Sequence, residues 1–188
     1  MKKKILEIII QIIPVMIGVY LGFVVSDWSD SQKRKVQSVR LLENIRSEIN
    51  TNKQIVAGGL DYHEMVRDSS RYYSGDGLAI GRPAFFQGTR HRTLVNSAYK
   101  TGVQTGVINE LPINSIQELN QLYTLQDSYN DYGKMQLEGL INKDFFKDEE
   151  SIGGIARYLS MTMTDIVIKE NYLLQKYRTI ESELKKIK

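Results

Sequence analysis

The sequence has few of the residue types that commonly carry protein chemistry. Its 188 residues include no cysteine, two histidines, three prolines and one tryptophan. Without cysteine there is no disulfide framework, no thiolate metal ligand and no cysteine nucleophile. The histidines, His63 and His91, are not closely spaced, so a metal site or a Ser-His-Asp triad would depend on long-range contacts. We therefore predict no metal, no cofactor and no enzymatic activity.

The overall composition is that of a folded chain. Hydrophobic residues make up 41% of the sequence and charged residues 25%, which excludes a disordered or low-complexity protein. A chain of this length forms one ordinary soluble domain, or a smaller domain with an attached membrane segment. The second arrangement fits this sequence, and we divide it into residues 1–26 and residues 27–188.

Residues 5–25 form a long apolar run after three lysines. Of these 21 residues, 15 are Ile, Leu, Val, Met or Phe, and Glu7 and Gln11 are the only strongly polar ones. As a helix, the run covers roughly 31 Å, close to the hydrocarbon thickness of a bilayer. A cleaved signal peptide is the alternative, but the run is longer than a typical signal core and no Ala-x-Ala-like site follows it. The pattern favours a retained signal-anchor helix in contact with membrane lipid.

The flanking charges give only a weak indication of orientation. Lys2, Lys3 and Lys4 precede the run, while four basic residues follow it at 33–40, so the positive-inside comparison is nearly even. The first charges to meet the insertion machinery often dominate, and long domains cross largely regardless of charge. We favour a single-pass protein of a bacterial inner membrane, with its N-terminus in the cytoplasm and its soluble domain in the periplasm. The opposite orientation is the alternative.

One face of the predicted span carries small and polar residues. At 100° per residue, Gln11, Pro14, Gly18 and Gly22 lie within one arc of about 80°. Gly18 and Gly22 have the G-x-x-x-G spacing that lets helices approach closely in lipid, although glycine is also common in membrane helices that do not associate. The pattern predicts an association face.

The rest of the chain reads as all-α, with a helical bundle or coiled-coil-like domain after the span. Hydrophobic periodicity predicts helices over about 31–57, 60–73, 89–100, 115–140 and 155–187. Gly58 and Gly59 are expected to separate the first two helices, and nothing between residues 25 and 33 interrupts the rod formed with the span. For the fourth helix, Asn114 or Ser115 is expected to be the N-cap.

The last helix has an unusually regular heptad pattern. Two series of apolar residues spaced at multiples of seven predict a packing seam, interrupted by Glu170. Such a seam forms either a coiled coil between chains or the inner face of a bundle, where it packs on the apolar face of residues 36–49. We favour the bundle. The predicted seam consists of Leu159, Met163, Ile166, Leu173, Tyr177, Ile180 and Leu184.

A basic cluster occupies residues 82–92 and includes Arg90, His91 and Arg92. Such a cluster contacts anionic lipid, an acidic partner or nucleic acid, or it is a solvated helix start capped by Thr89. Outside residues 1–26, which hold three Lys and Glu7, 22 basic residues remain against 21 acidic ones. This balance argues against a nucleic-acid partner, and we favour the solvated helix start.

Four segments of the first third form a recognisable pattern: Ile17-Gly18-Val19-Tyr20-Leu21-Gly22-Phe23, Asp27-Trp28-Ser29-Asp30, Lys33-Arg34-Lys35, and Leu41-Leu42-Glu43-Asn44-Ile45 with Glu48. In these segments the chain resembles a large family of uncharacterised bacterial single-span proteins of the Bacteroidetes type. The resemblance covers roughly residues 5–55 and implies an anchored helical domain without assigned activity, so it supplies no catalytic residues.

Two functions from different classes fit these patterns. The first is a non-enzymatic, membrane-anchored helical protein that forms homo-oligomers or serves as an accessory subunit of a membrane or envelope complex. The second is a single-span sensor or ligand-binding module, with a site at the aromatic-rich helix 116–132 and the glycine-rich loop 75–81. An enzyme ranks third, because no nucleophile is placed beside a base.

Overall fold

A computed structural model describes residues 2–74, 84–143 and 149–187, and for residues 2–11 and 149–152 it describes the backbone only. These residues form helices and no strand, so the fold is all-α. Helix α1 spans Lys2–Ser74, and α2 spans Ser97–Thr105. A 3-10 helix, η1, covers Val107–Glu110, followed by α3 at Ile113–Ile141 and α4 at Glu149–Leu184.

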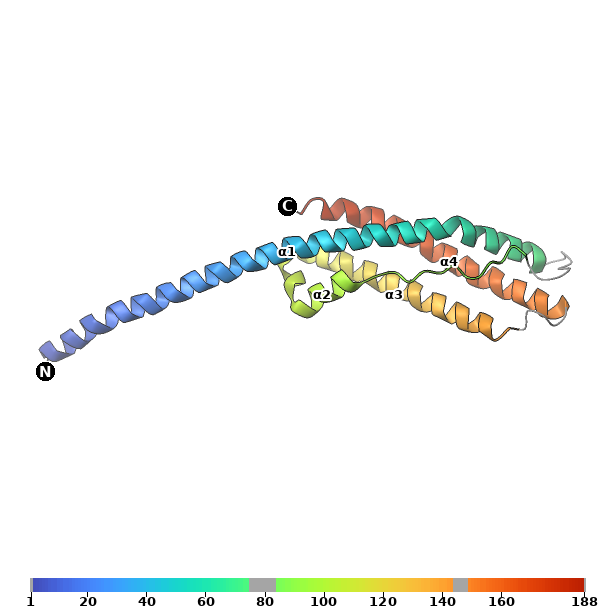
Figure 1. Cartoon of the computed structure of the whole chain (residues 1–188). Coiled ribbons are helices and arrows are strands. Elements are labelled where there is room, and N and C mark those ends of the chain that lie inside the picture. The colour runs from blue at the N-terminus through green and yellow to red at the C-terminus, as the bar shows by residue number, and fades with distance from the viewer. Residues whose placement is uncertain (1, 75–83, 144–148, 188) are drawn as a thin grey trace.

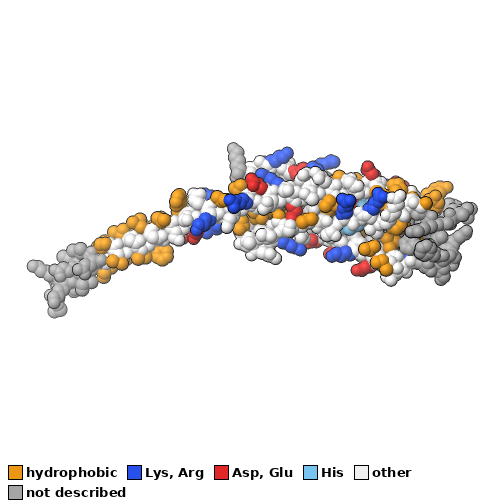
Figure 2. All heavy atoms as spheres, viewed as in Figure 1, with side chains coloured by type: hydrophobic (Ala, Val, Ile, Leu, Met, Phe, Trp, Pro, Cys, Tyr) orange, Lys and Arg blue, Asp and Glu red, His pale blue; other side chains and the backbone are white. Residues whose placement is uncertain are grey.

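Helix α1 is one gently curved rod, and its N-terminal part extends far beyond the other helices (Figure 1). This part includes an 18-residue stretch with a mean hydropathy of 1.6 and no residue buried within the protein. Figure 2 shows hydrophobic side chains along it, while charged side chains lie over the rest of the molecule. By length and composition, α1 is able to cross a membrane, as the sequence predicted.

The C-terminal half of α1 packs with α3 and α4 into a bundle, and α4 lies against α1 along most of its length (Figure 1). All seven residues of the predicted seam on α4 are buried in this core. Five of them cluster with buried residues of α1 that include Leu42, Ile45, Ile49 and Val56, while Leu159 and Met163 cluster with Val66 of α1 and Leu140 of α3. The heptad pattern therefore serves packing within the chain, because α4 lies between two other helices.

The bundle begins later along α1 than the periodicity predicted. Val36 and Val39 were expected on its inner face, but their side chains are 51% and 50% exposed. Leu41 is the first buried residue of α1 among those whose side chains are described. Val36 lies on the side of α1 opposite Ile45, whereas Val39 lies about one turn before the buried Leu42, ahead of the point where the bundle begins.

The predicted break at Gly58 and Gly59 is wrong, because α1 continues through both glycines to Ser74. Each glycine costs a helix about 1 kcal/mol relative to alanine, which packing of the surrounding turns offsets. Gly59 also has a steric role. A Cβ atom there would lie 3.1 Å from Cε1 of His63 and 3.5 Å from Oε1 of Glu170.

The helix predicted over 89–100 is also misplaced. Residues 86–96 form neither helix nor strand and are called the extended segment below; α2 begins only at Ser97, so Thr89 caps no helix. Similarly, α3 begins at Ile113 after Pro112, one or two residues before the predicted caps Asn114 and Ser115. For residues 86–96 the local signal is outweighed by side chains from α1 and α3 that bond to the segment.

Two other predictions fall outside the described residues. One is the glycine-rich loop 75–81, proposed for a sensor site. Of the predicted association face, the side chain of Gln11 is also outside the described part.

Side chains from α1 hold the C-terminal end of α4. The guanidinium group of Arg46 donates to the carbonyl oxygen of Leu184 and, at 3.3 Å, to that of Ile187. These carbonyls belong to the C-terminal end of α4, where a cation is favoured by the helix dipole. Two turns further along α1, Lys53 pairs with Glu181 at 2.7 Å.

Candidate functional site

An extended segment, residues 86–96, runs along the bundle beside α1 and α3 (Figure 1). The amide side chain of Asn52 on α1 accepts from the Val95 amide at 2.9 Å and donates to its carbonyl at 2.7 Å. Asn130 on α3 pairs with the amide and carbonyl of Leu94 in the same way, at 2.8 and 3.1 Å. The two asparagines satisfy backbone groups that a neighbouring strand would otherwise pair.

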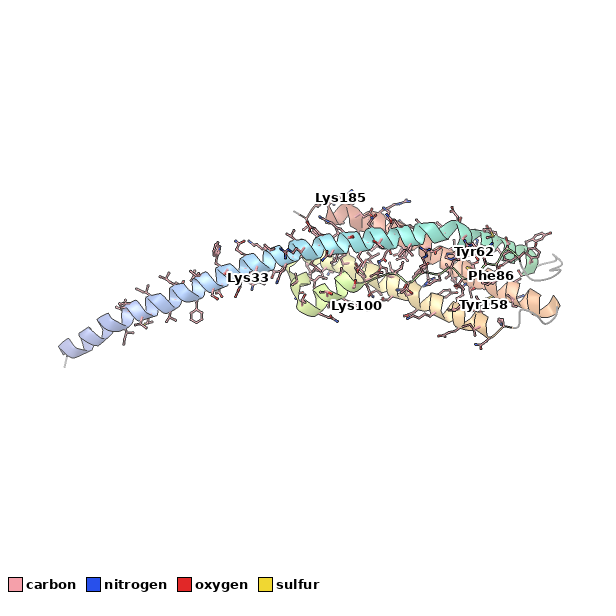
Figure 3. All side chains as sticks on the ribbon, in the orientation of Figure 1. Lys33, Tyr62, Phe86, Lys100, Tyr158 and Lys185 are labelled. Carbon is pink, nitrogen blue, oxygen red and sulfur yellow. The ribbon has the colours of Figure 1, made fainter. Side chains whose placement is uncertain are left out.

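Tyr62 of α1 holds the start of the segment. Its hydroxyl accepts from the amide of Gln87 at 2.9 Å and donates to the carbonyl of Gly88 at 2.7 Å. Figure 3 shows Tyr62 close to Phe86 at the end of the bundle far from the N-terminus. Gly88 has a φ of 90°, a left-handed conformation that glycine adopts without steric cost.

Glu48 of α1 holds the other end, where α2 begins. Its carboxylate accepts from the hydroxyl of Ser97 at 3.0 Å and from the amide of Ala98 at 2.8 Å. The buried hydroxyl of Tyr123 on α3 donates to it at 2.6 Å. Burial, followed by this hydrogen bond, raises the pKa of Tyr123. A carboxylate on α1 therefore caps α2 in place of a local N-cap side chain.

Between these two ends, a buried polar cluster joins three helices. Nδ1 of His63 on α1 lies 2.7 Å from Oε1 of Glu170 on α4, and the Tyr129 hydroxyl of α3 donates to the same oxygen at 2.8 Å. The side chains of His63 and Glu170 are 1% and 0% exposed. Nε2 of His63 lies 2.8 Å from the carbonyl oxygen of Thr89. The cluster thus fixes the extended segment as well as the helices.

The hydrogen-bond partners of His63 also show where protons must lie. The Thr89 carbonyl only accepts, so Nε2 carries a proton. The bond between Nδ1 and Glu170 contains a second proton, which lies on the imidazole or on the carboxyl group. In either form the pair is electrically neutral overall, and this neutrality makes its complete burial tolerable.

His91 lies next to this cluster. Its ring stacks on Tyr129 with 4.2 Å between ring centroids, and it fills the space left by Gly133 on α3, where any Cβ atom would overlap the ring. Both ring nitrogens are buried, and neither has a hydrogen-bond partner among the described residues. Burial, and next the charge of His63, lower the pKa of His91 to about 4. His91 is therefore neutral near pH 7.

On the outer side of the cluster, α1 and the extended segment enclose a pocket of about 420 Å³. Among the described residues, no acidic side chain lines it. Its lining consists of Gln54, Ile55, Gly58, Gly59, Tyr62, Arg90, His91 and Arg92. The basic cluster predicted as a solvated helix start therefore belongs to an extended segment and borders this pocket, where guanidinium groups are suited to bind anions.

A second hollow, of about 440 Å³, lies between α1 and α2 beside Glu48. The carboxylate of Glu48 is already occupied by donors from α2 and α3, so it is not free to bind a ligand. In the described part of the chain, no group of three His, Asp or Glu side chains is arranged to hold a metal ion. The pocket beside Arg90 is the better candidate for a binding site.

The residues that the sequence singled out, the seam on α4 and the association face on the span, do not line this pocket. The seam on α4 is core, while Gly18 and Gly22 lie on the protruding part of α1, where an added Cβ atom would meet no described heavy atom within 4 Å. Sequence reasoning missed the cluster of His63, Tyr129 and Glu170. The available signal was Glu170 itself, a carboxylate at a seam position where every neighbouring seam residue is apolar.

No family model, curated protein or solved structure matches this chain.

We predict that replacing Glu170 with leucine destabilises the full-length protein by about 3–5 kcal/mol, because His63 is left buried without its partner. Adding His63→Leu to this variant should recover part of the loss. Urea unfolding in detergent, followed by circular dichroism, measures both free energies. Glu181→Leu, which breaks the more exposed pair with Lys53, is the control and should cost less than about 1 kcal/mol. Equal losses in the two single variants would contradict the prediction.

We also predict that acid destabilises the protein partly through His91. The pKa of His91 is about 4 in the folded protein against an ordinary value of 6.5, so between these values the unfolded chain binds a proton that the folded chain excludes. The free energy of unfolding should therefore fall as the pH drops from 6.5 to 4. His91→Leu removes this contribution, and its stability should fall less over the same range. Parallel pH profiles for the two proteins, measured by urea unfolding, would refute this role.

Proposed function

We propose that this chain is a non-enzymatic, single-span membrane protein that acts as a self-associating or accessory subunit of a membrane or envelope complex. Helix α1 is the anchor, and the bundle of α1, α3 and α4 is the soluble part. Support for the anchor comes from the protruding, unburied apolar stretch of α1. The resemblance of residues 5–55 to Bacteroidetes-type single-span proteins supports the same assignment.

The observation that carries the proposal is a continuous, uncovered face on α1. At 100° per residue, Gly18, Gly22 and Val36 lie within an arc of about 40°, on the side of the helix opposite Ile45 and Ile49. Both glycines are open on their outer side, and Val36 is half exposed. The same face therefore continues from the predicted span into the first turns beyond it.

A second copy of α1 fits this face better than lipid and water do. In lipid, the glycines permit close backbone contact between two helices. Beyond the span, burying Val36 and Val39 removes apolar surface from water. In a parallel pair, Arg40 of one copy would lie beside Glu43 of the other, because these residues flank the face on opposite sides.

The absence of native cysteine makes this arrangement directly testable. We expect Val36→Cys to form a disulfide-linked dimer of twice 21.6 kDa when membranes are treated with a mild oxidant, since paired faces bring the two Cα atoms within bridging distance. Non-reducing gel electrophoresis measures the yield. Ser31→Cys, on the opposite side of the helix, is the matched control and should remain monomeric.

The glycines provide the second half of the test. Gly18→Leu with Gly22→Leu should abolish the Val36→Cys dimer without disturbing the chain's own packing, since a Cβ atom at either glycine meets no described atom within 4 Å. Equal yields at positions 31 and 36, or no dimer at either, would remove the self-association model. A stoichiometric foreign protein that copurifies with the monomer would instead support the accessory-subunit form.

For location we propose a bacterial inner membrane, with the N-terminus in the cytoplasm and the bundle in the periplasm. Ser182 is exposed on α4, so a Ser182→Cys variant presents one thiol on the bundle surface. In cells with a permeabilised outer membrane, a maleimide that cannot cross the inner membrane should label this thiol. Labelling that occurs only after lysis would reverse the orientation.

A second candidate function is a ligand-binding or sensor module. The observation in its favour is the pocket between α1 and the extended segment, which is lined by two arginines and two glycines. Because α1 runs unbroken from the predicted span to this pocket, one helix contacts both regions.

A further inference from the structure

We propose that the pocket bordered by Gly58, Arg90 and Arg92 binds a small organic anion with a carboxylate or phosphate group. This inference goes beyond the anchoring function and does not depend on self-association. It rests on the charge, the shape and the preorganisation of the pocket.

The charge of the lining is uniformly positive. Arg90 and Arg92 are the only ionised side chains among the described residues that line the pocket, because His91 is neutral near pH 7. Arg92 forms no ion pair with any other described residue, so its guanidinium group is available. A planar guanidinium group offers paired N–H donors that match the oxygens of a carboxylate or a phosphate.

The shape depends on Gly58. A Cβ atom at this position would meet no described atom within 4 Å, whereas a Cβ atom at Gly59 would press on His63. Gly59 is thus explained by packing, but Gly58 is not. A glycine inside a long helix lowers helix stability, and here its effect is to leave space on the pocket side of α1.

Arg90 is held in place before any ligand arrives. Its guanidinium carbon lies 4.2 Å from the ring centroid of Tyr62, and one of its N–H groups donates to the side chain of Gln87. Its backbone has a φ of 48°, a left-handed conformation that costs a non-glycine residue energy and is found preferentially at functional sites. These contacts fix the guanidinium group at the edge of the pocket, which lowers the entropic cost of binding.

The dimensions favour a small soluble ligand. A volume of about 420 Å³ lies within the usual range for small-molecule sites. Along α1, Gly58 is roughly 50 Å from the end of the predicted span at residue 25, which is beyond the headgroups of the membrane that holds the anchor. The amide of Gln54 is a further polar group for the uncharged part of the ligand.

The test uses the full-length protein in a neutral detergent and two families of probes. Inorganic phosphate and pyrophosphate form one arm, succinate and citrate the other, and sodium chloride at equal ionic strength serves as the reference. Isothermal titration calorimetry measures binding, and the thermal unfolding midpoint should rise with probe concentration. Saturable binding of a probe from either family supports the proposal. The family that binds with the higher affinity shows whether the pocket prefers a phosphate or a carboxylate group.

The variants separate this pocket from other basic surfaces. Arg92→Gln should weaken binding by about tenfold or more, while Arg178→Gln, an exposed arginine on α4, should leave it unchanged. Gly58→Leu should fill the pocket and abolish binding without loss of stability, since leucine is the better helix former and its Cβ atom meets no described neighbour. Gly154→Leu, at an open glycine of α4, is its control.

Three results would overturn the proposal. The first is the absence of any shift beyond that produced by sodium chloride. The second is an equal loss of binding in Arg92→Gln and Arg178→Gln, which would indicate nonspecific attraction to basic surface. The third is undiminished binding by a folded Gly58→Leu protein.

Discussion

The arrangement of the bundle depends on one buried carboxylate. Glu170 of α4 is the shared hydrogen-bond partner of His63 of α1 and Tyr129 of α3, and His63 extends the connection to the backbone of Thr89. Apolar seams alone permit neighbouring helices to slide by a turn, because one leucine layer resembles the next. A buried polar group with fixed partners favours one alignment, since any other leaves it without those hydrogen bonds. The cluster is therefore best understood as the feature that selects the register of three helices.

The same chemistry continues along the extended segment. Asn52, Asn130, Glu48 and Tyr62 each bond to backbone groups of residues 86–98, so the segment is held by side chains rather than by a neighbouring strand. This arrangement keeps a non-helical stretch fixed against a helical bundle and satisfies its buried amides and carbonyls. It also places Arg90 and Arg92 on the surface at defined positions. The candidate pocket is thus a consequence of how the core polar groups are satisfied.

Sequence reasoning recovered the features that repeat along the chain. The apolar run, the helical periodicity and the heptad on α4 are signals over many residues; the run lies on the unburied part of α1, and the heptad is buried in the bundle. It failed where one long-range contact outweighs a local preference. Gly58 and Gly59 resemble a helix end, yet the helix continues because Gly59 packs against His63 and Glu170. Thr89 resembles an N-cap, yet its carbonyl is bonded to His63, and the cap of α2 comes from Glu48. The pocket could not be predicted from the sequence for the same reason, because the residues on its two sides are distant in the sequence.

The stretch of α1 between the predicted span and Leu41 has a geometric consequence. Residues 27–40 form an uninterrupted helical stem of roughly 21 Å that touches little of the bundle. Within one helix, the angular positions of all faces are locked to the number of residues between them. The length of the stem therefore sets both the distance of the bundle from the apolar stretch of α1 and its rotational phase relative to the glycine face. An insertion or deletion in the stem that is not close to a whole number of helical turns would rotate the Arg90 pocket relative to the glycine face. The apolar stretch and the bundle would each keep their own structure.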